Sequence, residues 1–386
     1  MQVAPAHLEY WLRDYYFSTE IDIGCSGVES FSFGELRQLF NITPDELDRI
    51  VMRDSRTLGA PDLRTAIGNR WANGNAERVM ATNGSSEAIY LIMHALLEAG
   101  DEVVVLDPAY QPLFSIAESV GCELKHWRLR FEESFHPDLN EARRLIGPET
   151  RMIVVNFPHN PTGASVTLAE QDELIELAAN TGAYLVWDAA FAEITYNGPV
   201  LPDPGERYDR TITLGTLSKA YGLPGLRVGW CLAAPDVLES LITLRDYTTL
   251  HLSPLVEHIA TRAIENADLL LQPRLAQARH NLELLEAWAN RHSRFVSMVR
   301  PQGGVCVFMR LHDVDDVEDF CRELADKYSV LLVPGTSFGH PEHVRLGFGC
   351  STSDLTEALS RLSEHFNTYR QIQPPSSYAH STATSV

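Results

Sequence analysis

Four short apolar runs alternate with helical patterns in the middle of this 386-residue chain, and this alternation constrains the fold more than any other feature. Each run is rich in β-branched residues and has the length of one buried strand. The runs cover residues 102–106, 151–155, 183–187 and 211–214. Between them, stretches such as 168–180 carry apolar residues at helical spacing. Strands separated by helices need crossover connections, so we predict an α/β fold with a parallel sheet covered on both faces.

The pattern changes beyond about residue 241. A long helical region over 255–291, with few turn signals apart from Pro273, precedes short strands and helices that predict a smaller α+β domain. These shorter elements are expected at 305–308, 317–327, 330–333 and 344–348. We therefore divide the chain into an N-terminal arm with part of the small domain, a large domain, the rest of the small domain and a disordered polar tail. The boundaries are 1–45, 46–285, 286–370 and 371–386.

Charge and cysteine content narrow the class of protein. The net charge is −21 and the pI is near 5.0, an acidic balance that repels nucleic acids and anionic membranes. The six cysteines are scattered, without a metal-binding spacing. The sequence shows neither a secretory signal nor an apolar run of about 20 residues. We expect a cytoplasmic protein that acts on a small molecule, with no metal and no nucleic-acid or membrane partner.

Polar residues follow the expected strands at the edge where a parallel sheet binds its ligands. Lys219 lies after the strand at 211–214, where burial would lower the pKa of its amine and make it a nucleophile able to form a Schiff base. Asp188 follows the strand at 183–187, and Asn160 follows the strand at 151–155. Each has a plain alternative: Lys219 as a solvated lysine, Asp188 as a helix cap and Asn160 as a turn residue.

A phosphate site is expected beside this lysine. Gly84, Ser85 and Ser86 precede an apolar helical run, so they offer small residues and free amides at a helix N-terminus. Arg227, eight residues beyond Lys219, could pair with the same phosphate. The alternatives are an ordinary helix start and a surface ion pair.

Together these motifs resemble those of the class I/II aminotransferases, which hold pyridoxal 5'-phosphate on fold type I. Residues 216–229, TLSKAYGLPGLRVG, resemble the cofactor-lysine signature of that family. Further matches in the same order are 59–64 (GAPDLR), 159–163 (HNPTG), 301–304 (PQGG) and 344–347 (VRLG). The resemblance implies a large cofactor-binding domain with a mostly parallel seven-stranded sheet between helices, and a smaller α+β domain.

The resemblance also implies a role for each matching residue. Lys219 would bond to the cofactor, Asp188 would pair with the ring nitrogen, and Tyr110 would stack on the ring. The full set of expected cofactor-binding residues is Gly84, Ser85, Ser86, Tyr110, Asn160, Asp188, Phe191, Thr216, Lys219 and Arg227. Arg345 would bind the substrate carboxylate, with Gly27 and Asn160 beside the substrate. A protonated ring then stabilises a carbanion at Cα.

Two positions depart from the common family pattern. Phe191 stands where the family usually has a tyrosine that donates to the ring hydroxyl. Asp54 stands where the family usually has a tyrosine that reaches the partner subunit's site, and Arg53 or Arg56 could substitute for it. Members of the family share active sites across a two-fold axis, so we expect a homodimer.

Several segments resemble a narrower subgroup, formed by capreomycidine synthase and the enduracididine-forming enzyme of guanitoxin biosynthesis. They include 187–191 (WDAAF), which carries the Phe191 departure, and 252–257 (LSPLVE). The resemblance implies a cyclodehydratase that closes a hydroxy-L-arginine into a cyclic guanidino amino acid. We favour 4-hydroxyarginine giving L-enduracididine over 3-hydroxyarginine giving capreomycidine.

Orienting a guanidinium needs a carboxylate, and expelling hydroxide needs an acid. We expect Glu9 and the stretch near Ser26 and Glu29 to line the substrate pocket, although Glu9 could equally lie on a solvated helix face. Two other functions remain open. One is an ordinary aminotransferase acting on an arginine-like or aromatic amino acid. The other is a non-catalytic binding module with the same fold.

Overall fold

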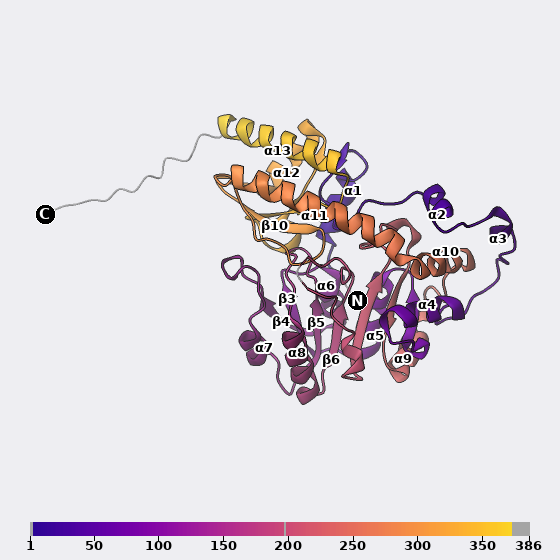
Figure 1. Ribbon diagram of the computed structural model, residues 1–386. Helices are drawn as coiled ribbons and strands as arrows, with labels where there is room; N and C mark the ends of the chain where they lie inside the picture. The colour runs from indigo at the N-terminus through magenta and orange to yellow at the C-terminus, as the bar shows by residue number, and fades with distance from the viewer. Residues whose placement is uncertain (1–2, 197, 373–386) are drawn as a thin grey trace.

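The large sheet has the mostly parallel arrangement that the sequence predicts (Figure 1). The computed structural model describes residues 3–196 and 198–372, and within them a seven-stranded sheet has the order β2-β8-β7-β6-β5-β3-β4. Only β8 in this sheet runs antiparallel to its neighbours. The strands are β2 (Val79–Thr82), β3 (Glu102–Asp107), β4 (Glu123–Arg128), β5 (Thr150–Asn156), β6 (Tyr184–Asp188), β7 (Thr211–Thr216) and β8 (Gly229–Leu232). All four strands expected from the apolar runs are confirmed; β3, β5 and β7 are one or two residues longer than expected, and β6 is shifted by one residue.

Helices cover both faces of this sheet because successive strand residues point to opposite sides. In β3, Val103 and Val105 pack into one buried cluster, while Val104 and Leu106 pack into another. The first cluster includes α5 (Ser85–Leu96), α6 (Pro112–Val120) and α9 (Pro235–Arg245). The second includes α4 (Pro61–Trp71), α7 (Leu139–Leu145) and α8 (Leu168–Thr181). The strands are nearly continuous apolar runs for this reason.

A second group of strands and helices lies beyond the carboxyl edge of the large sheet (Figure 1). An antiparallel sheet has the order β12-β13-β10-β9, and β1 pairs in parallel with β11. The strands are β1 (Ile21–Asp22), β9 (Val296–Ser297), β10 (Cys306–Leu311), β11 (Val330–Leu331), β12 (Val333–Pro334) and β13 (His343–Gly347). The helices are α11 (Ala267–Arg291), α12 (Val317–Tyr328) and α13 (Thr352–Ile372). This matches the mixed α and β content expected after residue 241.

Two expectations for this part need correction. The helical region at 255–291 is two helices, α10 (Pro254–Glu265) and α11, and the break falls at Asn266 rather than at Pro273. Asn266 leaves the helical conformation, with φ −117° and ψ 24°, and its Nδ2 donates to the Arg262 carbonyl oxygen at 2.8 Å. The expected strand at 330–333 is split, because β11 pairs with β1 and β12 pairs with β13.

The domain boundaries stay a prediction. Helix α11 runs across residue 285, and the N-terminal arm contributes β1 to the sheet that contains β11. Residues 371 and 372 continue α13, whereas 373–386 of the expected tail lie outside the described residues. No helix in the described part of the chain is long and apolar enough to cross a membrane.

The N-terminal arm connects the two parts of the molecule. In α1 (His7–Tyr15), Trp11 Nε1 donates to the Leu332 carbonyl oxygen at 2.9 Å, and the His7 amide donates to Gln111 Oε1 at 2.9 Å. The chain then leads through α2 (Phe33–Leu39) and α3 (Pro44–Asp48), which extend away from the body of the molecule (Figure 1).

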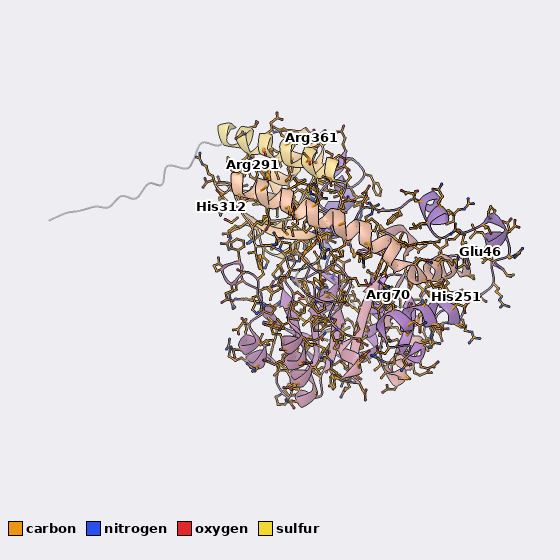
Figure 2. All side chains as sticks on the ribbon, viewed as in Figure 1. Glu46, Arg70, His251, Arg291, His312 and Arg361 are labelled. Atoms are coloured by element: carbon orange, nitrogen blue, oxygen red, sulfur yellow. The ribbon has the colours of Figure 1, made fainter. Side chains whose placement is uncertain are left out.

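Ion pairs fasten these outer segments. Glu46 of α3, labelled in Figure 2, lies 2.8 Å from His258 Nε2 of α10. Arg361 of α13 pairs with Glu20 at 2.9 Å, beside β1. Exposed ion pairs contribute at most about 1 kcal/mol each, so burial of the apolar faces remains the main source of stability.

Candidate active site

A cavity of about 610 Å³ lies at the carboxyl ends of the large-sheet strands, between that sheet, the N-terminal arm and the smaller sheet. Eleven of the site residues expected from the sequence line it, and they come from segments far apart in the chain. They are Glu9, Ser85, Ser86, Tyr110, Asn160, Asp188, Phe191, Thr216, Lys219, Arg227 and Arg345. The two expected glycines, Gly27 and Gly84, adjoin lining residues without lining the cavity themselves.

Lys219 and Asp188 form the buried polar centre of this cavity. Burial lowers the pKa of Lys219, although nearby Cys25 opposes that shift, and its Nζ donates to Ser26 Oγ at 3.1 Å. Burial raises the pKa of Asp188 to about 6, against the effects of the Ala190 N–H and of Lys219. Burial thus disfavours the charged form of both groups, and an additional positive partner would stabilise the charge of the carboxyl group.

One end of the cavity has the form of a phosphate cup. Ser85 and Ser86 begin the twelve-residue helix α5, whose first amides have no helical acceptor. Gly84 has φ 74°, and a Cβ atom there would lie 2.6 Å from Arg227 Nη2. A glycine at this position therefore lets the guanidinium approach the helix N-terminus closely. Thr216 adds a hydroxyl group from the end of β7.

A buried ion pair supports this cup from behind. Arg245 is fully buried, and its Nε lies 3.1 Å from Glu87 Oε1. The other carboxylate oxygen of Glu87 accepts a hydrogen bond of 2.5 Å from the Asn83 amide, immediately before Gly84. Arg245 also donates to the Ala81 carbonyl oxygen at 2.9 Å. The pair fixes the backbone that leads into α5.

The opposite wall is a hydrogen-bonded chain of amides and a guanidinium. Arg345 is 1% exposed, and its Nη1 donates to Asn160 Oδ1 at 3.1 Å. The Asn160 amide donates to Asn156 Oδ1 at 2.8 Å, and Asn156 Nδ2 donates to the Asp188 carbonyl oxygen at 2.9 Å. Arg345 Nη2 also donates to the Gly24 carbonyl oxygen at 2.8 Å. These bonds link the small-sheet arginine to the strand ends of the large sheet.

The N-terminal arm closes the cavity with an acidic group. Glu9 Oε1 accepts a hydrogen bond from the Tyr110 hydroxyl at 3.3 Å, and burial together with Glu9 raises the pKa of Tyr110 to about 12. Ser26 also lines the cavity, as expected. Glu29 does not line it, which corrects the expectation for that residue. Its carboxylate turns away and pairs with Arg274 at 2.7 Å.

Sequence reasoning missed several residues that line the cavity. Ser218 lies within the quoted motif 216–229 and Asn156 is the last residue of β5, but no role was assigned to either. Tyr90 lies one helical turn after Ser86 on α5, so the i, i+4 spacing was a usable signal. Leu8 and Leu12 cover the cavity from α1, and their apolar pattern resembles ordinary packing.

This set of groups fits pyridoxal phosphate. A helix N-terminus, two serines and an arginine at one end suit a dianionic phosphate, and Gly84 leaves room for that arginine. At the other end, a buried carboxyl suits a ring nitrogen that carries a proton, and a buried amine suits an aldehyde.

Comparisons with known proteins agree with this geometry. Residues 47–362 match the family model "Aminotransferase class I and II". Capreomycidine synthase of Streptomyces vinaceus is 45% identical over 371 residues, which cover 95% of each chain. Arginine–pyruvate transaminase AruH of Pseudomonas aeruginosa is 31% identical over 296 residues, which cover 75% of this chain and 74% of the transaminase.

Solved structures give the same answer for the fold. The PLP-dependent cyclase OrfR has a TM-score of 0.91 at 43% identity, covering 96% of this chain and 98% of the cyclase. A PLP-dependent aminotransferase from Streptococcus suis has a TM-score of 0.90 at 31% identity, covering 96% of this chain and 99% of that chain. The expected fold type I architecture is confirmed. The chain belongs to the class I and II aminotransferase family and is a pyridoxal 5'-phosphate-dependent enzyme.

Proposed function

We propose that this enzyme is a cyclodehydratase that converts 4-hydroxy-L-arginine into L-enduracididine. The observation that supports cyclization best is the 45% identity to capreomycidine synthase over 95% of both chains. The choice of the 4-hydroxy substrate rests only on the resemblance to the subgroup that includes the enduracididine-forming enzyme.

The cofactor would be held by the residues expected from the sequence. Ser85, Ser86 and Arg227 would bind its phosphate, and Asp188 would hold a proton at its ring nitrogen. Bound in this way, pyridoxal phosphate supplies an electron sink for the carbon atoms next to the amino group. Phe191 packs in the wall of the cavity and cannot donate a hydrogen bond to the cofactor.

The remaining polar groups would bind and deprotonate the substrate. Arg345 would bind the α-carboxylate, while Lys219 Nζ takes the Cα proton, which a neutral amine can accept. Asn160, bonded to Arg345, would fix the orientation of that guanidinium.

The guanidine end of the substrate would lie against the N-terminal arm. Glu9 carries the carboxylate that would bind the guanidinium and fold the side chain back toward Cγ. Overall, the Cγ–O bond and one guanidine N–H bond break, a Cγ–N bond forms, and one water molecule leaves. The product has a five-membered ring.

A second candidate is cyclization of 3-hydroxyarginine at Cβ to the six-membered capreomycidine ring. The identity to capreomycidine synthase favours this reaction. Both reactions need the same proton acceptor and the same carboxylate near the guanidine. They differ in the carbon that the guanidine nitrogen attacks, and departure of a hydroxyl from Cγ also needs a second proton loss, from Cβ.

Ordinary transamination is a third candidate, favoured by the 31% identity to arginine–pyruvate transaminase. It predicts a free 2-oxo acid from the substrate and a requirement for an amino-group acceptor such as pyruvate. Cyclization needs no acceptor.

The deciding experiment incubates the holoenzyme separately with 3-hydroxyarginine and 4-hydroxyarginine, each with and without pyruvate. Mass spectrometry measures the loss of water, and NMR of the product determines the ring size. We expect acceptor-independent loss of one water from 4-hydroxyarginine and a five-membered ring. Turnover of 3-hydroxyarginine alone would establish the second candidate, and strict dependence on pyruvate the third.

We also propose that the active form is a homodimer in the cytoplasm. The segment before α4 extends from the body of the molecule (Figure 1), and Val51 and Met52 on it are each 69% exposed. Exposed apolar side chains on such an extension suit a partner surface. Arg53 or Arg56 would then replace the missing tyrosine at the partner's phosphate. Sedimentation that shows a fully active monomer would contradict the shared site.

The six free cysteines suit a reducing compartment, which supports the proposed cytoplasmic location.

A further inference from the structure

A second cavity lies back to back with the active site. It has a volume of about 340 Å³ and lies on the other face of the same strand ends. The alternation of side chains along a strand accounts for this arrangement. Asp188 lines the active site, whereas its neighbours Trp187 and Ala189 line the second cavity. Likewise, Asn156 lines the active site and Phe157 lines the second cavity. One layer of backbone therefore separates the two cavities.

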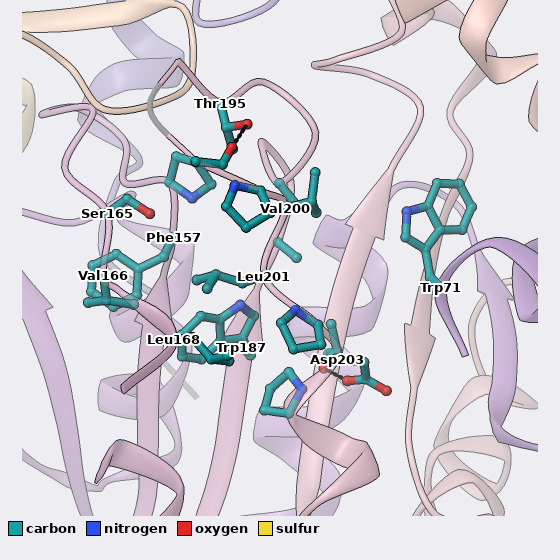
Figure 3. Close-up of a pocket in the computed structure, with 18 of the residues that line it drawn as sticks. Trp71, Phe157, Ser165, Val166, Leu168, Trp187, Thr195, Val200, Leu201 and Asp203 are labelled. Carbon is teal, nitrogen blue, oxygen red and sulfur yellow. Dashed lines mark hydrogen bonds between the residues drawn. The ribbon is translucent and has the colours of Figure 1, made fainter. Parts of the chain in front are cut away.

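The second cavity is mainly aromatic and apolar. Trp71, Trp187 and Trp230 all line it, and the rings of Trp71 and Trp230 stack with centroids 4.3 Å apart. Gly215 of β7 is needed for this wall, because a Cβ atom there would lie 2.2 Å from the Trp230 ring. Figure 3 shows Phe157, Trp187 and Leu201 on one side of the cavity and Trp71 on the other.

The cavity is covered by a rigid loop, which keeps it from closing by collapse. Residues 198–204 include three prolines, each with a fixed φ and no amide hydrogen. The loop is held at its end by Asp203, which accepts a 2.5 Å hydrogen bond from Thr213 on β7 and pairs with Arg78 at 2.8 Å. The Pro202 carbonyl oxygen accepts a hydrogen bond of 3.1 Å from Gln171 of α8.

The carboxylates at the rim already have hydrogen-bond or ion-pair partners. Glu170 lies 2.8 Å from His136 and also caps α8, and Asp203 pairs with Arg78. A charged ligand would find no free counter-ion among these groups, and burying an unpaired charge is strongly unfavourable. An uncharged flat ring can stack on the tryptophans. A dry apolar cavity of roughly 150 Å³ is large enough for benzene, so this one can take a two-ring molecule.

We propose that this cavity is an allosteric site for an uncharged aromatic molecule of one or two rings. The coupling runs through the strand ends that both cavities share. The Asp188 carbonyl oxygen accepts hydrogen bonds from the Phe157 amide at 3.1 Å and from Asn156 Nδ2 at 2.9 Å. The Ala189 amide donates to the Leu214 carbonyl oxygen at 2.9 Å. A ring seated against Trp187 and Ala189 therefore packs directly against the backbone that carries the Asp188 carboxyl group, which couples the affinities of the two sites.

The test measures binding of indole by calorimetry to the cofactor-free protein and to the holoenzyme. We expect saturable binding to both forms, with a Kd that differs between them. By linkage, saturating indole must change the Kd for pyridoxal phosphate by the same factor. The measurement reads binding, so it does not depend on which substrate the enzyme uses.

Matched variants locate the site. Leu201→Trp fills the cavity and should weaken indole binding at least about tenfold, which corresponds to ~1.4 kcal/mol. Leu269→Trp makes the same change on an exposed position of α11 and should leave the Kd unchanged. If Leu201→Trp does not fold, Val200→Trp at the rim takes its place.

Three outcomes would overturn the proposal. The first is absence of saturable binding, and the second is binding that neither cavity variant weakens. The third is competition between the two molecules. In that case the apparent indole Kd keeps rising as the concentration of pyridoxal phosphate is raised, because indole occupies the cofactor cavity. Equal indole Kd values in the two forms would contradict the coupling.

Discussion

The two cavities on either side of β6 and β7 share a wall but have opposite chemistry. On one side, Asp188, Lys219 and Arg345 are charged or titratable groups buried beside one another. On the other side, Trp187 and Trp230 present aromatic rings, and the nearby Asp203 carboxylate pairs with Arg78. The same backbone supports both sides, so side-chain alternation alone separates a reactive surface from an inert one.

This difference shows where burial of side chains costs free energy in the folded protein. Burying a carboxyl and an amine without full solvation shifts their pKa values, and such shifts mark functional sites. The strand residues that line the tryptophan cavity have no carboxyl or amine side chain whose pKa burial could shift. Burial of their apolar surface stabilises the fold. Substitutions on the first side should therefore change chemistry, whereas substitutions on the second should change binding or packing.

The largest effect is expected for Lys219→Ala. Without the Nζ atom the cavity has no group to bond the cofactor and none to take the Cα proton, so cyclization should slow by at least about 10⁴-fold. Product formation by mass spectrometry measures this. Lys327→Ala, at an exposed lysine paired with Glu323, is the matched control and should keep full activity. Borohydride reduction and peptide mapping should find the pyridoxyl group on residue 219 of the unmodified enzyme. Undiminished turnover in the variant would refute the assignment.

Asp188→Asn should reduce kcat by about 10²- to 10³-fold, because a neutral amide cannot hold the ring nitrogen in its protonated form. Steady-state kinetics at saturating cofactor provide the measurement. Asp203→Asn places the same change beside the second cavity. It should preserve kcat while lowering stability, since it breaks the pair with Arg78. Equal losses of kcat in both variants would contradict the view that only the active-site cavity takes part in the chemistry.

The pH dependence of stability should show the same asymmetry in the cofactor-free protein. Burial raises the pKa of Asp188 to about 6 from the ordinary value of 3.8 for an aspartate side chain. The folded state therefore binds the extra proton, and stability falls as pH rises from about 4 to 6, by roughly 3 kcal/mol in total. Urea unfolding of the unmodified protein and Asp188→Asn at several pH values isolates this contribution. A difference between the two proteins that does not change with pH would contradict it.

Much of this site could be predicted from the sequence, for a physical reason. Asp188 ends β6, Asn160 and Lys219 lie shortly after β5 and β7, and parallel strands bring their carboxyl ends to one edge. The strands themselves are short apolar runs rich in β-branched residues, which favour buried strands over other structures. Glu29 was misplaced because its sequence neighbours gave no sign of Arg274, which is brought close only by the tertiary fold.

The second cavity could not be predicted. Trp71, Trp187 and Trp230 have the pattern of ordinary core residues, and whether a core closes depends on packing volumes that a sequence pattern does not encode. The Arg245–Glu87 pair was missed for a related reason. Both residues lie on helices, 158 positions apart, and only the fold makes them neighbours.

Glu9→Gln tests the substrate end of the active cavity. Loss of one carboxylate that binds a guanidinium should raise KM for 4-hydroxyarginine by about tenfold, or ~1.4 kcal/mol, with a smaller change in kcat. Glu118→Gln, at an exposed position of α6, is the matched control. An uncharged analogue in which a urea replaces the guanidine should bind equally to both variants. If Glu9→Gln instead weakened the analogue as much as the guanidine substrate, its role would be structural.

The smallest effect on catalysis is expected when the second cavity is filled. The Leu201→Trp side chain would occupy space beside Trp187, but no atom of residue 201 lines the active site, so kcat should stay within about twofold of the unmodified enzyme. Overpacking could still lower stability by about 1–3 kcal/mol, and urea unfolding measures that separately. The Leu269→Trp control corrects for the general effect of an added tryptophan. A loss of kcat beyond tenfold in Leu201→Trp alone would mean that the shared backbone transmits packing strain to Asp188 even without a ligand. The two cavities would then act as one unit during catalysis.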